Sequence, residues 1–321
     1  MQRSQANKLL LLAAFLWGTG NVAQQTVLEN IGPFLAVGSR CLIASVVILP
    51  FILKTEPRIT ALDFASKRLG FLTILAFSAA VTFQQIGFGY TTVTNGGFIV
   101  NTTTVITPLI GRVFFLKRPA TIVWPAAFLS LTGAGLMSGG SLKGFNIGDL
   151  FCLSSAVSFS LWMIFLGEYV SKCGRAALLT LGQFMASGVI CLSISLAFEP
   201  IHLQKLEAAL PELLLLGVMS TGAAYLIQSI AQRYTSASEA AIITSGEAFF
   251  GAGSAFILLG EMPGALGVIG ATLILGGILL VQIPRQTFNL QNHRATKQCA
   301  ELAPQNHAFP NFESTDIRQR R

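Results

Sequence analysis

Ten stretches of about 20 apolar residues run along this 321-residue chain, and they limit its fold more than any other feature. A helix of about 20 apolar residues crosses the hydrocarbon core of a bilayer. Charged residues make up 11% of the chain, less than half the share of about 25% that is usual in soluble domains. The sequence therefore predicts an all-α integral membrane protein with ten transmembrane helices. The stretches lie at residues 9–27, 33–53, 70–90, 95–116, 121–138, 149–168, 177–198, 211–232, 236–259 and 264–283.

The basic residues are distributed unevenly among the connections between these stretches. If the N-terminus is cytoplasmic, 17 of the 21 Lys and Arg residues fall on the cytoplasmic side, and only Lys143 and Lys205 fall in outer loops. Cytoplasmic loops carry an excess of Lys and Arg, so the pattern predicts a multi-pass protein with an N-in/C-in orientation. The net charge of +7 is then a topology signal, and we expect no nucleic-acid partner. The first stretch is longer than the apolar region of a usual signal peptide, so we expect a retained helix.

The two halves of the chain match weakly at an offset near 144 residues. The matched pairs are Trp17 with Trp162, Tyr90 with Tyr234, Lys117 with Glu261, and Pro119 with Pro263. Each copy holds five stretches, and because five is odd the second copy enters the membrane from the opposite side. Inverted repeats with a substrate site near the midplane are typical of secondary transporters; the alternative is chance similarity between apolar helices. The predicted organisation is a cytoplasmic N-terminus at 1–8, five-helix repeats at 9–138 and 149–283, and a disordered cytoplasmic tail at 284–321.

Several short motifs, taken in order, resemble EamA-type transporters of the drug/metabolite transporter superfamily. They are Ala14 to Gly18, Ser39-Arg40, Asn95 to Phe98 with Pro108-Leu109, and the stretch from Ala231 to Val281 that contains Glu247 and Leu258 to Glu261. The resemblance covers residues 9–283 and implies two inverted five-helix repeats and transport of a small metabolite, with export preferred to import. Two positions depart from the family pattern. Ala248 stands where relatives often have Pro, and Lys117 stands where many have Glu.

Glu247 and Arg40 are the charged residues that the apolar stretches hold farthest from their ends. A carboxylate at the centre of a span costs about 2.5–3.5 kcal/mol on insertion scales, so such groups usually face a cavity or a partner. Glu247 is therefore either a site for a substrate ammonium group or a proton, or a structural acid bonded to a neighbouring helix. Arg40 has three alternatives: its side chain extends to the outer interface, pairs with Glu247, or binds a substrate carboxylate.

Polar side chains recur at helical spacing on several stretches and should point away from lipid. For any one of them, lining a cavity and bonding to a neighbouring helix are equally good interpretations. The predicted substrate-binding residues are Glu247, Arg40, Trp17, Asn21, Gln85, Asn101, Trp162, Gln183, Tyr225 and Gln228. Gly264, Gly267 and Gly270 allow close helix packing, either inside the molecule or in a homodimer, so both a monomer and a homodimer remain open.

No motif for ATP binding or for zinc proteolysis occurs, and the five cysteines form no metal-binding pattern. We therefore expect no cofactor, no metal and no enzymatic activity. The leading hypothesis is a secondary transporter in a bacterial inner membrane that exports small polar metabolites, with amino acids as the first class, by alternating access and with possible coupling to protons. The rival hypotheses are an integral-membrane enzyme and a structural or signalling membrane protein that transports nothing.

Overall fold

The computed structural model describes residues 1–55, 63–138, 146–259 and 264–283, and within these residues the chain is helical with no β-strand. The predicted all-α class is confirmed. The helices belong to one unit, Met1–Gln282, and the tail predicted to be disordered lies outside the described residues. The elements are α1 (Arg3–Thr26), η1 (Val27–Glu29), α2 (Pro33–Thr55), α3 (Phe64–Phe88), α4 (Val93–Asn101), α5 (Thr103–Val113), α6 (Val123–Met137), α7 (Ile147–Cys173), α8 (Ala176–Phe198), α9 (Leu203–Ala208), α10 (Leu210–Leu215), the π-helical segment η2 (Leu216–Ala223), α11 (Ala224–Ala231), α12 (Ala237–Thr244), α13 (Gly246–Leu259) and α14 (Ala265–Gln282).

Six helical segments of the described chain are long and apolar enough to cross a membrane. They are Pro33–Lys54, Phe64–Phe88, Ile147–Cys173, Ala176–Phe198, Leu210–Ala231 and Ala265–Gln282. The apolar helix α6 is shorter, and two of the predicted stretches are each divided between two helices, α4 with α5 and α12 with α13. The protein is therefore a multi-pass membrane protein.

The two divided helices are interrupted in the same way. Thr102 separates α4 from α5 and Ser245 separates α12 from α13, and the ψ angles of these residues are −15° and −17°. Each hydroxyl donates to the carbonyl three residues earlier, at 2.6 Å in both cases. The two residues lie close to the 144-residue offset at which the halves of the sequence match. A short tight turn inside a helix often marks a functional position.

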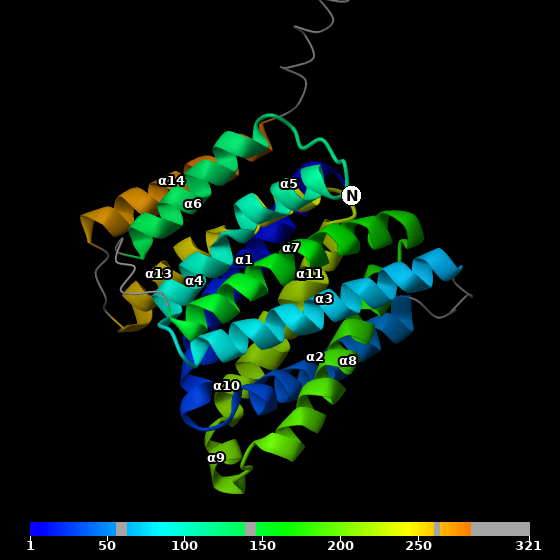
Figure 1. Cartoon of the computed structure of the whole chain (residues 1–321), viewed down its shortest axis with the longest axis vertical. Helices are drawn as coiled ribbons and strands as arrows, with labels where there is room; N and C mark the ends of the chain where they lie inside the picture. Colours follow the sequence, from blue (N-terminus) through cyan, green and yellow to red (C-terminus); the bar gives the residue numbers. More distant parts are fainter. Residues whose placement is uncertain (56–62, 139–145, 260–263, 284–321) are drawn as a thin grey trace, which may run out of the picture. The chain divides into compact units, whose positions relative to one another are not determined.

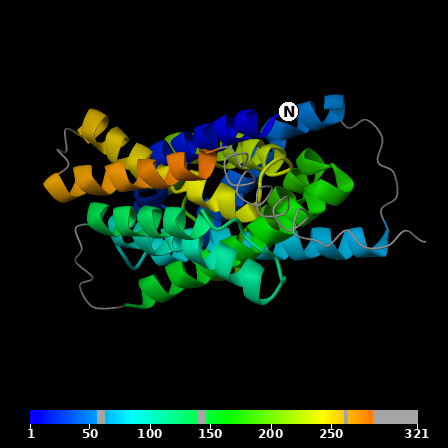
Figure 2. The ribbon, with the colours of Figure 1, turned by 90° about the horizontal axis from the view of Figure 1, so that it is seen from above.

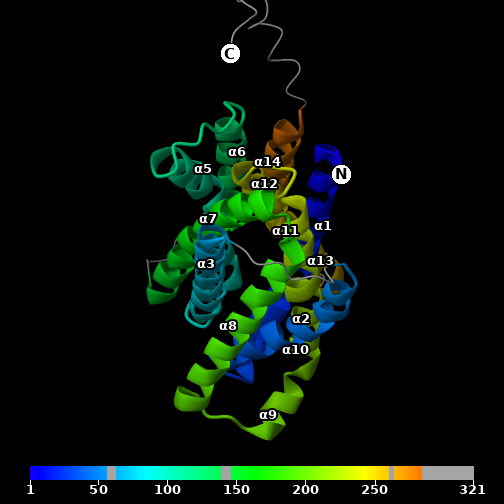
Figure 3. The same ribbon diagram turned by 90° about the vertical axis from the view of Figure 1, so that its right-hand side faces the viewer.

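Most of the main contacts between helices occur twice: a contact between two helices has a counterpart between the corresponding helices of the opposite halves of the chain. Helix α3 packs along α7, and in the same manner α1 packs against η2 and α11. Helix α1 also packs on α13, and α7 packs on α4 and α5. Helix α2 packs on η2, and α3 packs on α8. Two further large contacts join equivalent helices, α2 with α8 and α6 with α14. The α6–α14 pair is visible in Figure 1 and Figure 3, and in teal and orange in Figure 2.

Glycines bring α6 and α14 into direct backbone contact. A Cβ built on Gly133 would lie 2.5 Å from the carbonyl oxygen of Gly270, so no larger residue fits at this crossing. Small residues at helix interfaces allow such an approach in membranes. Gly270 therefore serves packing inside the molecule, whereas a Cβ on Gly264 would meet nothing within 4 Å.

Candidate functional site

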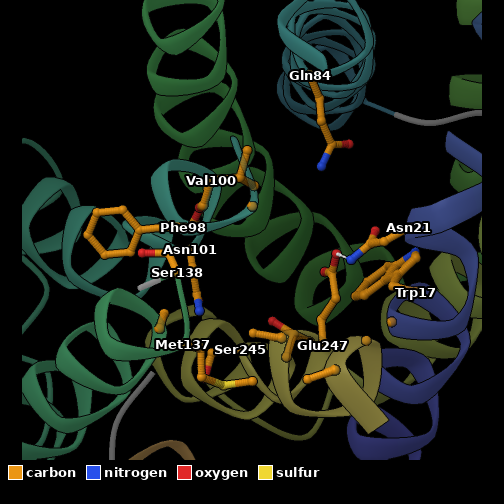
Figure 4. Close-up of a pocket in the computed structure, with 18 of the residues that line it drawn as sticks. Trp17, Asn21, Gln84, Phe98, Val100, Asn101, Met137, Ser138, Ser245 and Glu247 are labelled. Atoms are coloured by element: carbon orange, nitrogen blue, oxygen red, sulfur yellow. Dashed lines mark hydrogen bonds between the residues drawn. The ribbon is translucent and has the colours of Figure 1, made fainter. Parts of the chain in front are cut away.

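A cavity of about 850 Å³ lies among helices from both halves of the chain. Its lining residues come from α1, α3, α4, α5, α6, α7, α11, α12, α13 and α14, and none of those described comes from α2 or α8. Figure 4 shows side chains from several of these helices, with Gln84 of α3 extending toward the space from the side opposite α13. A cavity of this volume is in the range of small-molecule sites.

Most of the predicted site residues line this cavity. Seven do so, namely Trp17, Asn21, Asn101, Trp162, Tyr225, Gln228 and Glu247. The other three lie behind the wall. Gln183 accepts a hydrogen bond from Trp162 Nε1 at 3.0 Å, and Gln85 Nε2 donates to the backbone oxygen of Gln24 at 2.8 Å.

Arg40 is buried, with 2% of its surface exposed, so it does not extend to the outer interface. Its Nη1 donates to Gln24 Oε1 at 3.1 Å, and among the described ion pairs none joins Arg40 to Glu247. Of the three alternatives for Arg40, the first is wrong, and the second holds only indirectly, through the side-chain amides of Gln24 and Asn21. Arg40 is not among the residues that line the cavity.

Glu247 lies in the first turn of α13, directly after the interruption at Ser245. Its Oε1 accepts a hydrogen bond from Asn21 Nδ2 at 2.9 Å, drawn as a dashed line in Figure 4. Negative charge is stabilised at a helix N-terminus, where unpaired N–H groups and the helix dipole face it. The interruption therefore creates a favourable place for a carboxylate inside the helix bundle. Glu247 is the one Asp, Glu, Lys, Arg or His among the described lining residues.

Aromatic rings surround Tyr225 at one side of the cavity. The ring centroid of Tyr225 lies 4.8 Å from that of Trp17, 5.5 Å from that of Trp162 and 6.4 Å from that of Phe159. Trp17 is fixed by its Nε1, which donates to the backbone oxygen of Ser220 in the π-helical segment at 2.8 Å. Aromatic faces attract organic cations, so these rings complement the single carboxylate.

Two amide side chains carry buried polar atoms that have no hydrogen-bond partner among the described residues. They are Asn101 Nδ2 and Gln228 Oε1, and both residues line the cavity. Buried polar groups are almost always paired in native proteins, with protein or with water. The cavity wall therefore holds one donor and one acceptor that have no partner among the described residues.

Several other polar side chains connect helices to each other. Ser78 and Ser187 join α3 to α8 at 2.7 Å, and Thr180 Oγ1 donates to Ser229 Oγ of α11 at 2.9 Å. Thr107 likewise donates to Ser160 across α5 and α7. For these residues the helix-bonding interpretation holds, and the cavity interpretation does not.

Several lining residues were not among those predicted. They include Gln24, Gln84, Phe98, Phe159, Thr244 and Ser245. Gln24 follows Asn21 by one helical turn, so the polar spacing of α1 could have indicated it. Phe98 and Phe159 are ordinary apolar residues of a membrane helix and carry no such signal. No cluster of His, Cys, Asp and Glu that could hold a metal occurs in the described part of the chain.

Comparison with known proteins identifies the family. The model of the EamA-like transporter family matches residues 5–139 and again residues 146–283. An "Uncharacterized transporter" of Archaeoglobus fulgidus is 29% identical over 287 residues, which cover 88% of this chain and 87% of that protein. The "Uncharacterized transporter YdfC" of Bacillus subtilis is 22% identical over 282 residues, which cover 85% of this chain and 90% of that protein.

A solved structure has the same fold. A crystal structure described only as that of a protein superposes with a TM-score of 0.73 at 16% identity and covers 88% of this chain and 98% of its own. The relatives' names indicate a transporter rather than an enzyme. Together with the membrane-spanning helices and the two matched stretches, these findings show that the chain is a membrane transporter and belongs to the EamA-like transporter family.

Proposed function

We propose that the protein is a secondary active transporter that moves small metabolites with an ammonium group by alternating access. The observation that carries the proposal is a single carboxylate, Glu247, in a cavity bordered by the rings of Trp17, Tyr225 and Phe159. The carboxylate and the rings favour a cation, and the free amide atoms of Asn101 and Gln228 favour further polar groups. Amino acids are the first class to test, and simple organic amines are the second.

The proposed architecture is ten spans in two inverted five-helix repeats, at residues 9–138 and 149–283. The paired contacts between helices support it, as do the matching interruptions at Thr102 and Ser245. Interrupted helices at a midplane site between inverted repeats are a recurrent feature of secondary transporters. Each repeat can then rock against the other around the cavity. One chain supplies every described lining residue, so a monomer suffices.

The proposed orientation places both termini in the cytoplasm of a bacterial cell, with the spans in its inner membrane. In that orientation Ser138 and Gly264, which line the cavity, lie at the outer ends of α6 and α14. At their cytoplasmic ends, α1 and α12 are joined by an ion pair between Arg3 and Glu239 at 3.0 Å. The described conformation is then the outward-facing one. We propose export as the direction, with protons as the coupling ion.

Flux of radiolabelled amino acids and amines into and out of proteoliposomes, with and without a pH gradient, tests the proposal. We expect wild-type vesicles to exceed empty ones, and Glu247→Gln to reduce transport about tenfold or more, because the substrate's ammonium loses its charged partner. Glu207→Gln is the matched control, since Glu207 is exposed on α9. Wild-type flux equal to that of empty vesicles for every probe would refute transport of this substrate class.

A further inference from the structure

A chain of three hydrogen bonds leads from the cavity wall into the packed helices. Asn21 Nδ2 donates to Glu247 Oε1 at 2.9 Å, and Gln24 Nε2 donates to Asn21 Oδ1 at 3.2 Å. Arg40 Nη1 then donates to Gln24 Oε1 at 3.1 Å. The chain connects α13, α1 and α2, and a carboxylate and a guanidinium stand at its two ends.

Arg40 determines the direction of this chain. A guanidinium can only donate hydrogen bonds, whereas an amide side chain can present either its oxygen or its nitrogen. With Arg40 beside it, Gln24 must turn its oxygen toward Arg40 and its NH₂ group toward Asn21. Asn21 must then accept with its oxygen and turn its own NH₂ group toward Glu247. The orientation of both amides therefore follows from the chemistry of Arg40 alone.

Among the described residues, Gln24 is the one hydrogen-bond partner of the Arg40 side chain, and no ion pair of Arg40 is found there. Its Nε and Nη2 make no hydrogen bond within the described residues, and only 2% of its surface is exposed. A buried charge without a carboxylate partner is unfavourable for stability. Gln24 itself is held in place, because Gln85 Nε2 donates to its backbone oxygen at 2.8 Å. The contact between Arg40 and Gln24 is thus formed from two positioned groups.

We propose that Arg40 is a positioning residue for Glu247: by orienting Gln24 and Asn21 it keeps an N–H group on Oε1 and leaves Oε2 as the oxygen that meets the transported cation. This proposal rests on the proposed function, in which Glu247 binds the substrate. Arg40 acts through the two amides and touches no substrate. Hydrogen bonds aligned in one direction between opposite charges strengthen each other, so the chain acts as a unit.

The first test measures the reactivity of Glu247 in the purified full-length protein, so it needs no transported substrate. Dicyclohexylcarbodiimide modifies carboxyl groups in apolar surroundings, and mass spectrometry reports its rate of reaction at Glu247, with Glu247→Gln as the blank. In Arg40→Met we expect the rate to rise about tenfold, because both oxygens of the carboxyl group, and not Oε2 alone, then lack an N–H partner. Arg40→Lys, which can still donate to Gln24, should restore a rate close to that of the wild type.

Arg112→Met is the matched control. It removes an exposed arginine from another apolar stretch, α5, and should leave the rate unchanged. Thermal unfolding of each variant distinguishes a loss of folded protein from a loss of the hydrogen bond that positions Glu247. An unchanged rate in folded Arg40→Met, or a rise that Arg40→Lys fails to reverse, would overturn the proposal.

The second test uses transport of the amine or amino acid that gives the greatest wild-type flux. Arg40→Met and Gln24→Met should each raise KM about tenfold with a smaller effect on Vmax, and the double variant should be no worse than either one. Additive effects would show that the residues act separately. If Glu247→Gln transports normally, the proposed function fails; if it is inactive but Arg40→Met keeps its KM, only the positioning role fails.

Discussion

At Gly18, α1 approaches α13 so closely that no side chain fits between them. A Cβ on Gly18 would lie 2.6 Å from the backbone oxygen of Glu247 and 2.7 Å from the nitrogen of Gly251. Asn21 follows Gly18 by three residues, which places it on the same face of the helix. The absence of a side chain at Gly18 therefore lets the Asn21 amide reach the Glu247 carboxylate.

Gly18→Ala should destabilise the protein by about 1–3 kcal/mol, because the added methyl group overpacks this crossing. By helix propensity alone, alanine would stabilise the helix by about 1 kcal/mol over glycine. A loss of stability in Gly18→Ala therefore indicates the steric clash. Thermal unfolding in detergent and transport activity measure it. Gly253→Ala is the matched control in the same helix pair, since a Cβ there meets nothing within 4 Å; equal effects of the two variants would contradict the explanation.

Residue spacing predicted which face of a helix is polar but not how deep each side chain lies. Asn21 and Trp17 line the cavity, whereas Gln85 and Gln183 bond to neighbours behind its wall. Helical periodicity gives the direction in which a side chain leaves its own helix, but it does not tell how close the neighbouring helix lies. The same limit left the three alternatives for Arg40 open.

At the scale of elements, the start of α2 is held by a residue from the end of α8. The backbone N–H groups of Phe34 and Leu35 donate to the two carboxylate oxygens of Glu199, at 2.9 and 2.8 Å. The first N–H groups of a helix have no partner within the helix. Glu199 accepts hydrogen bonds from two of these N–H groups, and its negative charge is also stabilised at the helix N-terminus. This contact fastens α2 to α8 at one end of their long interface.

Glu199→Ala should lower the free energy of unfolding by about 1–3 kcal/mol, because two N–H groups lose a charged acceptor. The loss of thermal stability in detergent measures the effect. Glu207→Ala removes an exposed carboxylate from the neighbouring helix α9 and should change stability by less than about 0.5 kcal/mol. A fall of the same size in both variants would assign the effect to net charge and not to the contact.

The apolar stretches predicted the helices to within a few residues at most ends, but not their interruptions. Thr102 and Ser245 have ordinary helical φ values and differ from a regular helix only in ψ. Neither is a proline or a glycine, but Ser245 precedes Gly246, and a Ser/Gly pair is one of the usual causes of a kink, whereas Thr102 has no such neighbour. Their hydroxyl groups donate to carbonyl oxygens of the preceding turn. Thr and Ser also occur in membrane helices that have no break, so the residue type alone does not predict one.

At the scale of the molecule, Arg3 joins three helices at the end where the chain begins. It pairs with Glu239 of α12 at 3.0 Å and donates to the backbone oxygen of Val281 in α14, also at 3.0 Å. The side chain of Glu239 is only 3% exposed, so the pair is shielded from water on one side. In the proposed orientation this contact closes the cytoplasmic side of the cavity.

Arg3→Gln should shift the protein toward an inward-facing conformation by about fivefold, since the pair is worth about 1 kcal/mol. A cysteine at Gln228 in an otherwise cysteine-free protein, labelled by an impermeant maleimide in inside-out vesicles, reports the shift as a faster reaction. Lys8→Gln removes an exposed cation from the same helix and should leave the labelling rate unchanged. Slower or equal labelling in Arg3→Gln would contradict a closing role.

The sequence by itself determined that the chain is a helical membrane protein, because 52% hydrophobic and 11% charged residues in repeated apolar stretches suit lipid and cannot cover a soluble domain. It also singled out Glu247, because a charge within an apolar helix needs a partner or a cavity. Only the tertiary structure decided that Asn21 is that partner, that Gln24 stands between Asn21 and Arg40, and that aromatic rings line the same cavity as the carboxylate. These contacts join residues far apart in the chain, and their formation depends on how closely whole helices approach each other.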